Sequence, residues 1–193
     1  MRQLYISDTH FGHANIINFD KRPFKSVEEM DEALIQNWNE VVHKDDTVNI
    51  LGDFCWQKAS RWIEILKQLK GNKILIRGNH DLKSFPHELK NYFAVVSEQL
   101  GIVDEGRKVI LNHYPQPFYW HDTDEKVYML YGHVHNTAEA EEVEKLRKYI
   151  PTVLPNHKAQ FYNCWCGNFN WAPATLDQII NFYKEKDNEI YSS

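Results

Sequence analysis

The sequence Leu4-Tyr5-Ile6-Ser7-Asp8-Thr9-His10 joins a short apolar run to an aspartate and a histidine. Four more polar stretches follow such runs: Gly52-Asp53, Gly78-Asn79-His80-Asp81, Asn112-His113 and Gly132-His133-Val134-His135. Short apolar runs of this kind are typical of buried β-strands. Because α/β folds build their sites at the carboxyl ends of strands, we expect the five polar stretches to meet at one site.

The side chains in these stretches are the donor types that divalent metal ions use. They are aspartate, histidine and asparagine, with no cysteine. Oxygen and nitrogen donors of this kind suit Mn, Fe, Zn, Ni or Mg better than a structural zinc knot. There are too many of them for one ion, whereas two ions that share a bridging carboxylate would use them all.

The ordered set D-x-H, G-D, G-N-H-D, H and G-H-x-H, over residues 8–135, resembles the calcineurin-like metallophosphoesterase superfamily. Each motif alone is weak, but five in this order, each after a strand-like run, form a specific pattern. Residues 7–13 and the Asn-Ile-Ile that follows resemble the small, single-domain prokaryotic and phage phosphoesterases. The resemblance implies an α/β fold, an α+β sandwich of two packed mixed β-sheets flanked by helices. Periodicity alone predicts only one α/β domain.

The resemblance also implies which residues would hold two divalent ions, with Mn as the expected metal and Fe, Zn, Ni or Mg as alternatives. The first ion would take Asp8, His10, Asp53 and His135, and the second would take Asp53, Asn79, His113 and His133. The shared ligand, Asp53, would bridge the two ions. His80 would face the leaving group as general acid or phosphate donor, and Asp81 would orient it.

Arg77 and His13 are candidates for binding the substrate phosphate. Arg77 precedes the Gly-Asn-His motif, as in the protein-phosphatase branch of the superfamily, and a guanidinium suits phosphate. A structural ion pair is the alternative for Arg77, and a packing or surface role is the alternative for His13. That branch also carries an arginine shortly after its Gly-Asp. Here residues 54–57 are Phe-Cys-Trp-Gln, which argues against a phosphoprotein substrate.

Composition limits the class of protein. The 193 residues carry a net charge of −5 and are 42% hydrophobic, which fits one domain over residues 1–186 with a polar tail at 187–193. Extended nucleic acid is not expected as a partner, because no basic stripe is present. Three cysteines give no disulfide framework, and no apolar run approaches a membrane span. With no signal peptide recognised, we expect a cytoplasmic protein without a membrane partner.

Several elements are predicted outside the motifs. Ser26 should begin a helix over 27–41, and residues 58–70, 85–92, 137–149 and a stretch after Thr175 should be helical. Residues 95–113 read as one hairpin that turns at Glu105-Gly106. The aromatic loop from Tyr114 to Glu125 would form either a lip of the substrate site or a hydrophobic plug.

The predicted function is hydrolysis of a small phosphoester, with nucleotides among the candidates. The alternative is a metal-dependent nuclease or nucleic-acid end-processing enzyme, which a basic groove would support. A non-catalytic scaffold of the same fold is a third reading. Such a scaffold would be expected to have lost ligands, and this chain keeps the whole set.

Overall fold

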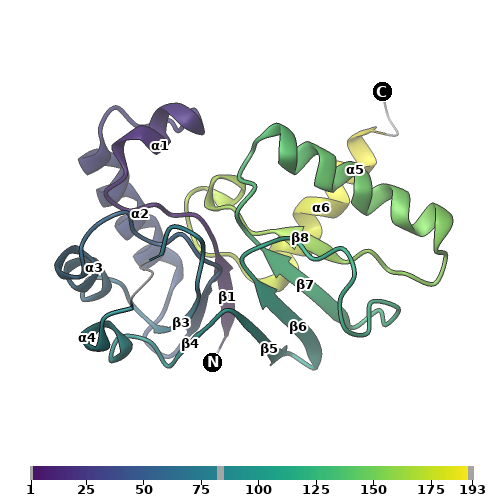
Figure 1. Ribbon diagram of the computed structural model, residues 1–193, viewed down its shortest axis with the longest axis horizontal. Coiled ribbons are helices and arrows are strands. Elements are labelled where there is room, and N and C mark those ends of the chain that lie inside the picture. Colours follow the sequence, from purple (N-terminus) through teal and green to yellow (C-terminus); the bar gives the residue numbers. More distant parts are fainter. Residues whose placement is uncertain (1, 82–84, 191–193) are drawn as a thin grey trace.

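The computed structural model describes residues 2–81 and 85–190. Two four-stranded sheets lie side by side, with strand orders β1-β2-β3-β4 and β5-β6-β7-β8. Helices α1 to α4 lie beside the first sheet and α5 and α6 beside the second (Figure 1). The predicted fold class, two sheets flanked by helices, is confirmed.

The first sheet is entirely parallel. It contains β1 (Gln3–Ile6), β2 (Thr47–Ile50), β3 (Asn72–Ile76) and β4 (Val95–Ser97). Parallel neighbours need crossover connections, and these carry α1 (Ala14–Phe19), α2 (Val27–Val41), α3 (Ala59–Leu66) and the single turn α4 (His87–Lys90). All four carboxyl ends therefore lie along one edge. The expected mixed pairing is absent from this sheet, since its four strands run in one direction.

The second sheet is mixed. Strands β5 (Gln99–Asp104) and β6 (Arg107–Asn112) form the antiparallel hairpin, and β7 (Val127–Tyr131) and β8 (Phe161–Asn163) run parallel to β6. The single hairpin predicted over 95–113 is wrong in its first part. Residues 95–97 pair with β3 in the first sheet, so the chain passes from one sheet to the other at Glu98. The turn at Glu105-Gly106 lies where it was expected.

Strands β1, β2 and β7 are buried on both faces. Leu4 and Ile6 of β1 pack in a cluster with Trp38 and Trp62 of the helices, whereas Tyr5 faces a second cluster. That second cluster lies between the two sheets and α6. It includes Leu51 and Ile76 from the side of the first sheet, Leu111 and Leu130 from the second sheet, and Ile179 from α6. The second sheet packs its other face on α5, through residues such as Met129 and Ile150.

Four helices differ from the predicted bounds. Helices α3 and α4 are shorter than the predicted 58–70 and 85–92, since α3 ends at Leu66 and α4 spans only His87–Lys90. Helix α5 (Ala138–Val153) continues past residue 149 and contains Pro151, and α6 (Leu176–Ile190) continues into the expected polar tail. The two helices contact each other there, because Asp187 lies 2.6 Å from Nη2 of Arg147 and 3.2 Å from Nζ of Lys148. All three cysteines are free and buried, as expected. Among the helices of the described ranges, none combines the length and apolar character needed to cross a bilayer.

Candidate metal centre

The expected ligands lie at the carboxyl ends of the strands, in loops with an unusual backbone. Five of them have a positive φ: Asp8 at 57°, His10 at 52°, Asp53 at 50°, His133 at 72° and His135 at 47°. Residues other than glycine rarely adopt this left-handed conformation, and its occurrence often marks functional sites. The loops therefore hold these side chains in directions that ordinary turns would not give.

The first expected ligand group lies in one cluster. One donor atom from each of Asp8, His10, Asp53 and His135 lies within 4.8 Å of the others. Nε2 of His135 is 3.3 Å from Nε2 of His10 and 3.4 Å from Oδ1 of Asp8. Four donors converging at this spacing could hold one divalent ion.

The second expected group adjoins the first. Oδ1 of Asn79 lies 2.9 Å from Nε2 of His113 and 2.9 Å from Nδ1 of His133. Oδ2 of Asp53 lies 3.6 Å from Nε2 of His10 and 3.7 Å from Nε2 of His113. One carboxylate oxygen thus faces a donor of each group, which is the position that a bridging ligand requires. The other oxygen, Oδ1, accepts the backbone N–H of His80 at 2.9 Å.

Two motif glycines make room for the carboxylates. A Cβ atom at Gly78 would lie 2.1 Å from Oδ1 of Asp53, and one at Gly132 would lie 2.6 Å from Oδ2 of Asp8. Both distances are far below van der Waals contact. Glycine at these positions lets the backbone approach the two acidic side chains closely.

Asp20 and Arg22 support the centre, and the sequence analysis missed both. The Asp20 carboxylate lies 2.8 and 2.9 Å from Nδ1 of His135, which leaves Nε2 of that ring facing the centre. Arg22 is buried and donates to Asp20 and to the carbonyls of Asp8 and Thr9. A carboxylate on the outer nitrogen of a histidine is the usual partner of a metal-binding imidazole.

The charges of the side chains in this cluster favour the binding of a cation. Burial lowers the pKa of His135, but the carboxylates of Asp8 and Asp20 outweigh it and raise that pKa to about 10. Burial raises the pKa of Asp8, yet His135 and the neighbouring histidines bring it below its usual range, so the carboxyl stays ionised. Carboxylate, amide and imidazole donors together suit divalent ions, so the residues fit the metal pair that the resemblance implies.

His80 and Asp81 occupy different surroundings. The exposed His80 ring lies next to the centre, 5.9 Å from the ring of His10. Asp81 is buried and accepts the backbone N–H groups of Asp53, Phe54 and Gly78 at 2.7 to 3.0 Å. Within the described ranges none of its hydrogen bonds goes to His80, so the expected orienting role does not fit this structure. Its oxygens instead link the loop that carries Asp53 to the loop that carries Gly78.

The two residues expected to bind the substrate phosphate, Arg77 and His13, lie in different pockets. The Arg77 guanidinium pairs with Glu98, and Arg77 lines a different pocket, with Phe85 and Val96. This favours the structural ion pair, the alternative that the sequence left open. His13 lines the pocket above the metal centre, and its Nδ1 lies 3.4 Å from Nδ1 of His10.

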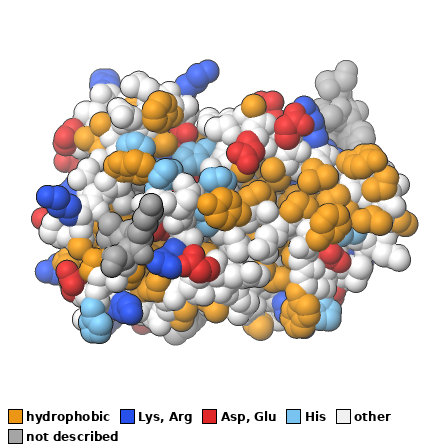
Figure 2. Space-filling view, viewed as in Figure 1, with side chains coloured by type: hydrophobic (Ala, Val, Ile, Leu, Met, Phe, Trp, Pro, Cys, Tyr) orange, Lys and Arg blue, Asp and Glu red, His pale blue; other side chains and the backbone are white. Residues whose placement is uncertain are grey.

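The pocket above the centre has a volume of about 350 Å³. It is lined by five histidines and Asp53 together with Asn15, Ile16, Phe19 and Trp56. On the surface, histidine side chains gather in one patch, and hydrophobic side chains border it (Figure 2). The pocket is therefore lined partly by side chains that could bind a metal ion and partly by aromatic side chains.

The loop over residues 114–125 was expected to form either a lip of the substrate site or a hydrophobic plug, and little of it lies at the pocket. Tyr114 lies beside the centre, 4.4 Å from the ring of His133. Tyr119 is buried and accepts the N–H of Gln160, as a plug would. Nζ of Lys108 lies over the ring of Trp120, and Lys108 lies in β6, five residues before His113 and so roughly 16 Å from it along the strand direction. Tyr119 and Trp120 therefore lie away from the site, whereas Tyr114 borders it.

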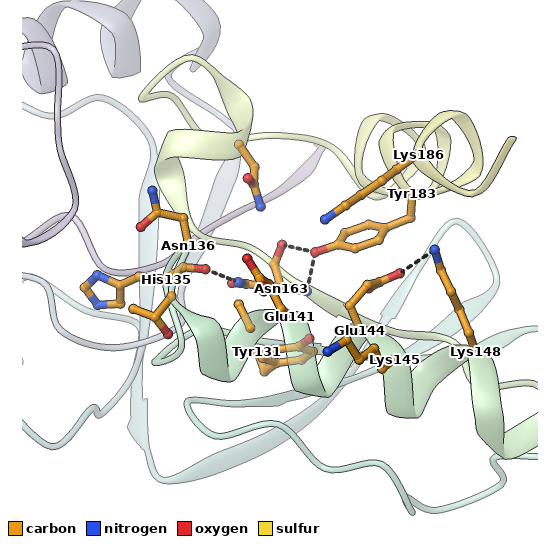
Figure 3. A pocket seen from close by; sticks show the side chains of 13 residues that line it. Tyr131, His135, Asn136, Glu141, Glu144, Lys145, Lys148, Asn163, Tyr183 and Lys186 are labelled. Carbon is orange, nitrogen blue, oxygen red and sulfur yellow. Dashed lines mark hydrogen bonds and ion pairs between the residues drawn. The ribbon is translucent and has the colours of Figure 1, made fainter. Parts of the chain in front are cut away.

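A larger cavity, of about 530 Å³, lies on the other side of His135 between α5 and α6. Figure 3 shows that the His135 ring points away from this cavity, while its backbone carbonyl accepts a hydrogen bond from Asn163. Because the metal-facing nitrogen is turned to the opposite side, the smaller pocket is the one that opens onto the centre.

Comparison with known proteins finds relatives of this chain in sequence and in fold. The chain is 36% identical over 188 residues to the uncharacterized protein MJ1445 of Methanocaldococcus jannaschii, which covers 96% of this chain and 93% of that protein. It is 29% identical over 159 residues to the Gene 66 protein of Mycobacterium phage L5, covering 68% and 76% of the two chains. The crystal structure of the protein of unknown function AQ665 from Aquifex aeolicus matches with a TM-score of 0.68 and 28% identity, over 93% of this chain and 97% of that one.

These relatives include a phage protein, in agreement with the prokaryotic and phage type that the sequence predicts. The family model described as calcineurin-like phosphoesterase matches residues 1–187, which is nearly the whole chain. With its two sheets and its clustered aspartates and histidines, the chain belongs to the calcineurin-like phosphoesterase family.

Proposed function

We propose that this protein is a hydrolase that uses two divalent ions to cleave a small phosphoester. The observation that carries the proposal is the position of Asp53, whose Oδ2 faces His10 of one donor group and His113 of the other. Two ions held there would supply charge to neutralise a phosphate and would lower the pKa of a bound water molecule.

The residues of the chain would divide the remaining work. Asp8, His10 and His135 would complete the first ion site with Asp53, and Asn79, His113 and His133 the second. Two carboxylates against two dications leave a net charge of about +2, which suits an anionic substrate. Mn is the metal we propose to test first.

His80 is proposed to act on the leaving group. Its backbone N–H is fixed on Oδ1 of Asp53, so the exposed ring is anchored at the rim of the pocket. From this place the imidazole could give a proton to the departing oxygen or donate a hydrogen bond to the phosphate. His13, on the same rim, would take the second of these roles.

The experiment is a substrate screen with Mn-loaded protein. It compares phosphomonoesters, cyclic nucleotides, bis-nitrophenyl phosphate and short oligonucleotides, before and after metal removal with a chelator. Metal-dependent turnover of the small esters would support the proposal. Turnover of oligonucleotides alone would favour a nuclease, and no turnover of any substrate by fully loaded protein would favour a scaffold.

A further inference from the structure

Large aromatic side chains are exposed beside the metal centre. Trp56 is 44% exposed and Phe19 is 72% exposed, and both line the pocket. The indole of Trp56 stacks on the ring of His13, with centroids 4.1 Å apart and planes 10° apart, and its centroid lies 4.4 Å from that of His80. Exposed aromatic surface that collects at a site is a common sign of ligand binding.

The backbone around Trp56 is fixed, although its ring is open to solvent. Its N–H donates to the carbonyl of Phe11 at 2.9 Å, and the preceding residue, Cys55, forms a bridge with Phe11. The next residue, Gln57, donates from Nε2 to the carbonyl of Gly12 at 2.8 Å. A flat ring held in this way needs little ordering when it receives a planar ligand.

A polar side chain lines the same pocket as the indole. Asn15 lines the pocket and is exposed. Within residues 2–81 and 85–190 its amide makes no hydrogen bond, so donor and acceptor are both free. A carboxamide can pair with the edge of a nucleobase, which carries donors and acceptors side by side.

We propose that the pocket binds a nucleotide, with its phosphate at the metal centre, its base packed against the solvent-exposed parts of Trp56 and Phe19, and Asn15 pairing with the edge of the base. This inference rests on the proposed function and names its substrate class. The ring centroids of Trp56 and His10 lie 6.1 Å apart, so this aromatic surface lies within the length of one nucleotide of the expected metal ligands. A pocket of about 350 Å³ suits one small ligand, not a long strand.

The test measures binding to the Mn-loaded protein by calorimetry, with adenosine 5′-monophosphate and inorganic phosphate as probes. Replacing Trp56→Ala should weaken nucleotide binding roughly 5- to 100-fold, because stacking on an aromatic ring contributes about that much per base. Binding of inorganic phosphate should weaken much less, and Trp56→Phe should restore part of the nucleotide affinity. Asn15→Ala should cost less than the tryptophan change.

Trp120→Ala is the matched control, since that tryptophan is 65% exposed but lies over Lys108, away from the pocket. It should leave both affinities unchanged. Equal losses of the two probes in Trp56→Ala, or no loss of either, would overturn the inference. Wild-type protein that binds the nucleotide no better than phosphate would also overturn it, while its hydrolysis of other small esters would leave the proposed function standing.

Discussion

The Asp20 carboxylate gives the sharpest test of how the first ion site is held. It contacts Nδ1 of His135 at 2.8 and 2.9 Å and the Arg22 guanidinium at 2.8 and 3.0 Å. In Asp20→Asn the side chain keeps its shape but has only one acceptor oxygen and no charge. An amide oxygen in the place of Oδ2 could still contact both partners, but the NH2 group in the place of Oδ1 would then face Nδ1 of His135, and the negative charge that both partners meet would be lost.

The expected loss of metal affinity is about 10- to 100-fold, the usual effect of changing the partner of a metal-binding histidine. This corresponds to about 1.4–2.8 kcal/mol of binding free energy. The free energy of unfolding should fall as well, because Arg22 is buried and loses its charged partner. Breaking a buried ion pair outright costs roughly 3–5 kcal/mol, and the retained amide oxygen should keep the loss at or below the lower end.

Manganese titration calorimetry and thermal unfolding, with and without Mn, measure the two effects separately. Asp46→Asn is the matched control, because Asp46 also pairs with an arginine, Arg2, but lies before β2 and not after it. The control should lose stability and keep its metal affinity. If Asp20→Asn bound Mn as tightly as the wild type, the supporting role of Asp20 would be refuted.

Three further changes test the centre directly. Asp53→Asn should lower the occupancy of both ions and nearly abolish turnover, and two tightly bound ions per chain in metal analysis would exclude the bridging role. His80→Ala should keep both ions and cost on the order of 10²–10⁴-fold with an alkyl leaving group but much less with nitrophenol. A uniform loss would show instead that His80 stabilises the phosphate. Gly132→Ala would place a methyl group 2.6 Å from Oδ2 of Asp8 and should weaken Mn binding, whereas Gly101→Ala, with no atom within 4 Å, should not; equal titrations would contradict this.

The residues of the centre could be predicted because each lies next to a short apolar run. A parallel sheet brings its carboxyl ends to one edge whatever the length of the connections, so motifs far apart in sequence meet there. The supporting pair could not be found in this way. Asp20 lies 115 residues from His135, in a segment without helical or strand periodicity, and no local rule relates the two.

The sequence also could not predict which exposed aromatic side chains face the pocket. Both Trp56 and Trp120 follow a ligand motif within a few residues, but only Trp56 faces the pocket. Nζ of Lys108 lies over the ring of Trp120, and the loop that carries this tryptophan is held in place by His157. His157 is buried, lies 2.9 Å from the carbonyl of Pro117 and 3.2 Å from Oδ2 of Asp122. These contacts join segments that are 35–40 residues apart.

The donors of the centre are divided between the two sheets by chemical type. The loops after β1, β2 and β3 supply every oxygen donor, from Asp8, Asp53 and Asn79, along with the nitrogen of His10. The loops after β6 and β7 supply only imidazoles, from His113, His133 and His135. Each of the two expected ion sites draws its donors from both sheets, so the full donor set would come together only when the apolar cluster between the sheets is packed. Since anything that binds only the folded state stabilises it, ions at this centre would strengthen the joint between the sheets as well as serve the chemistry.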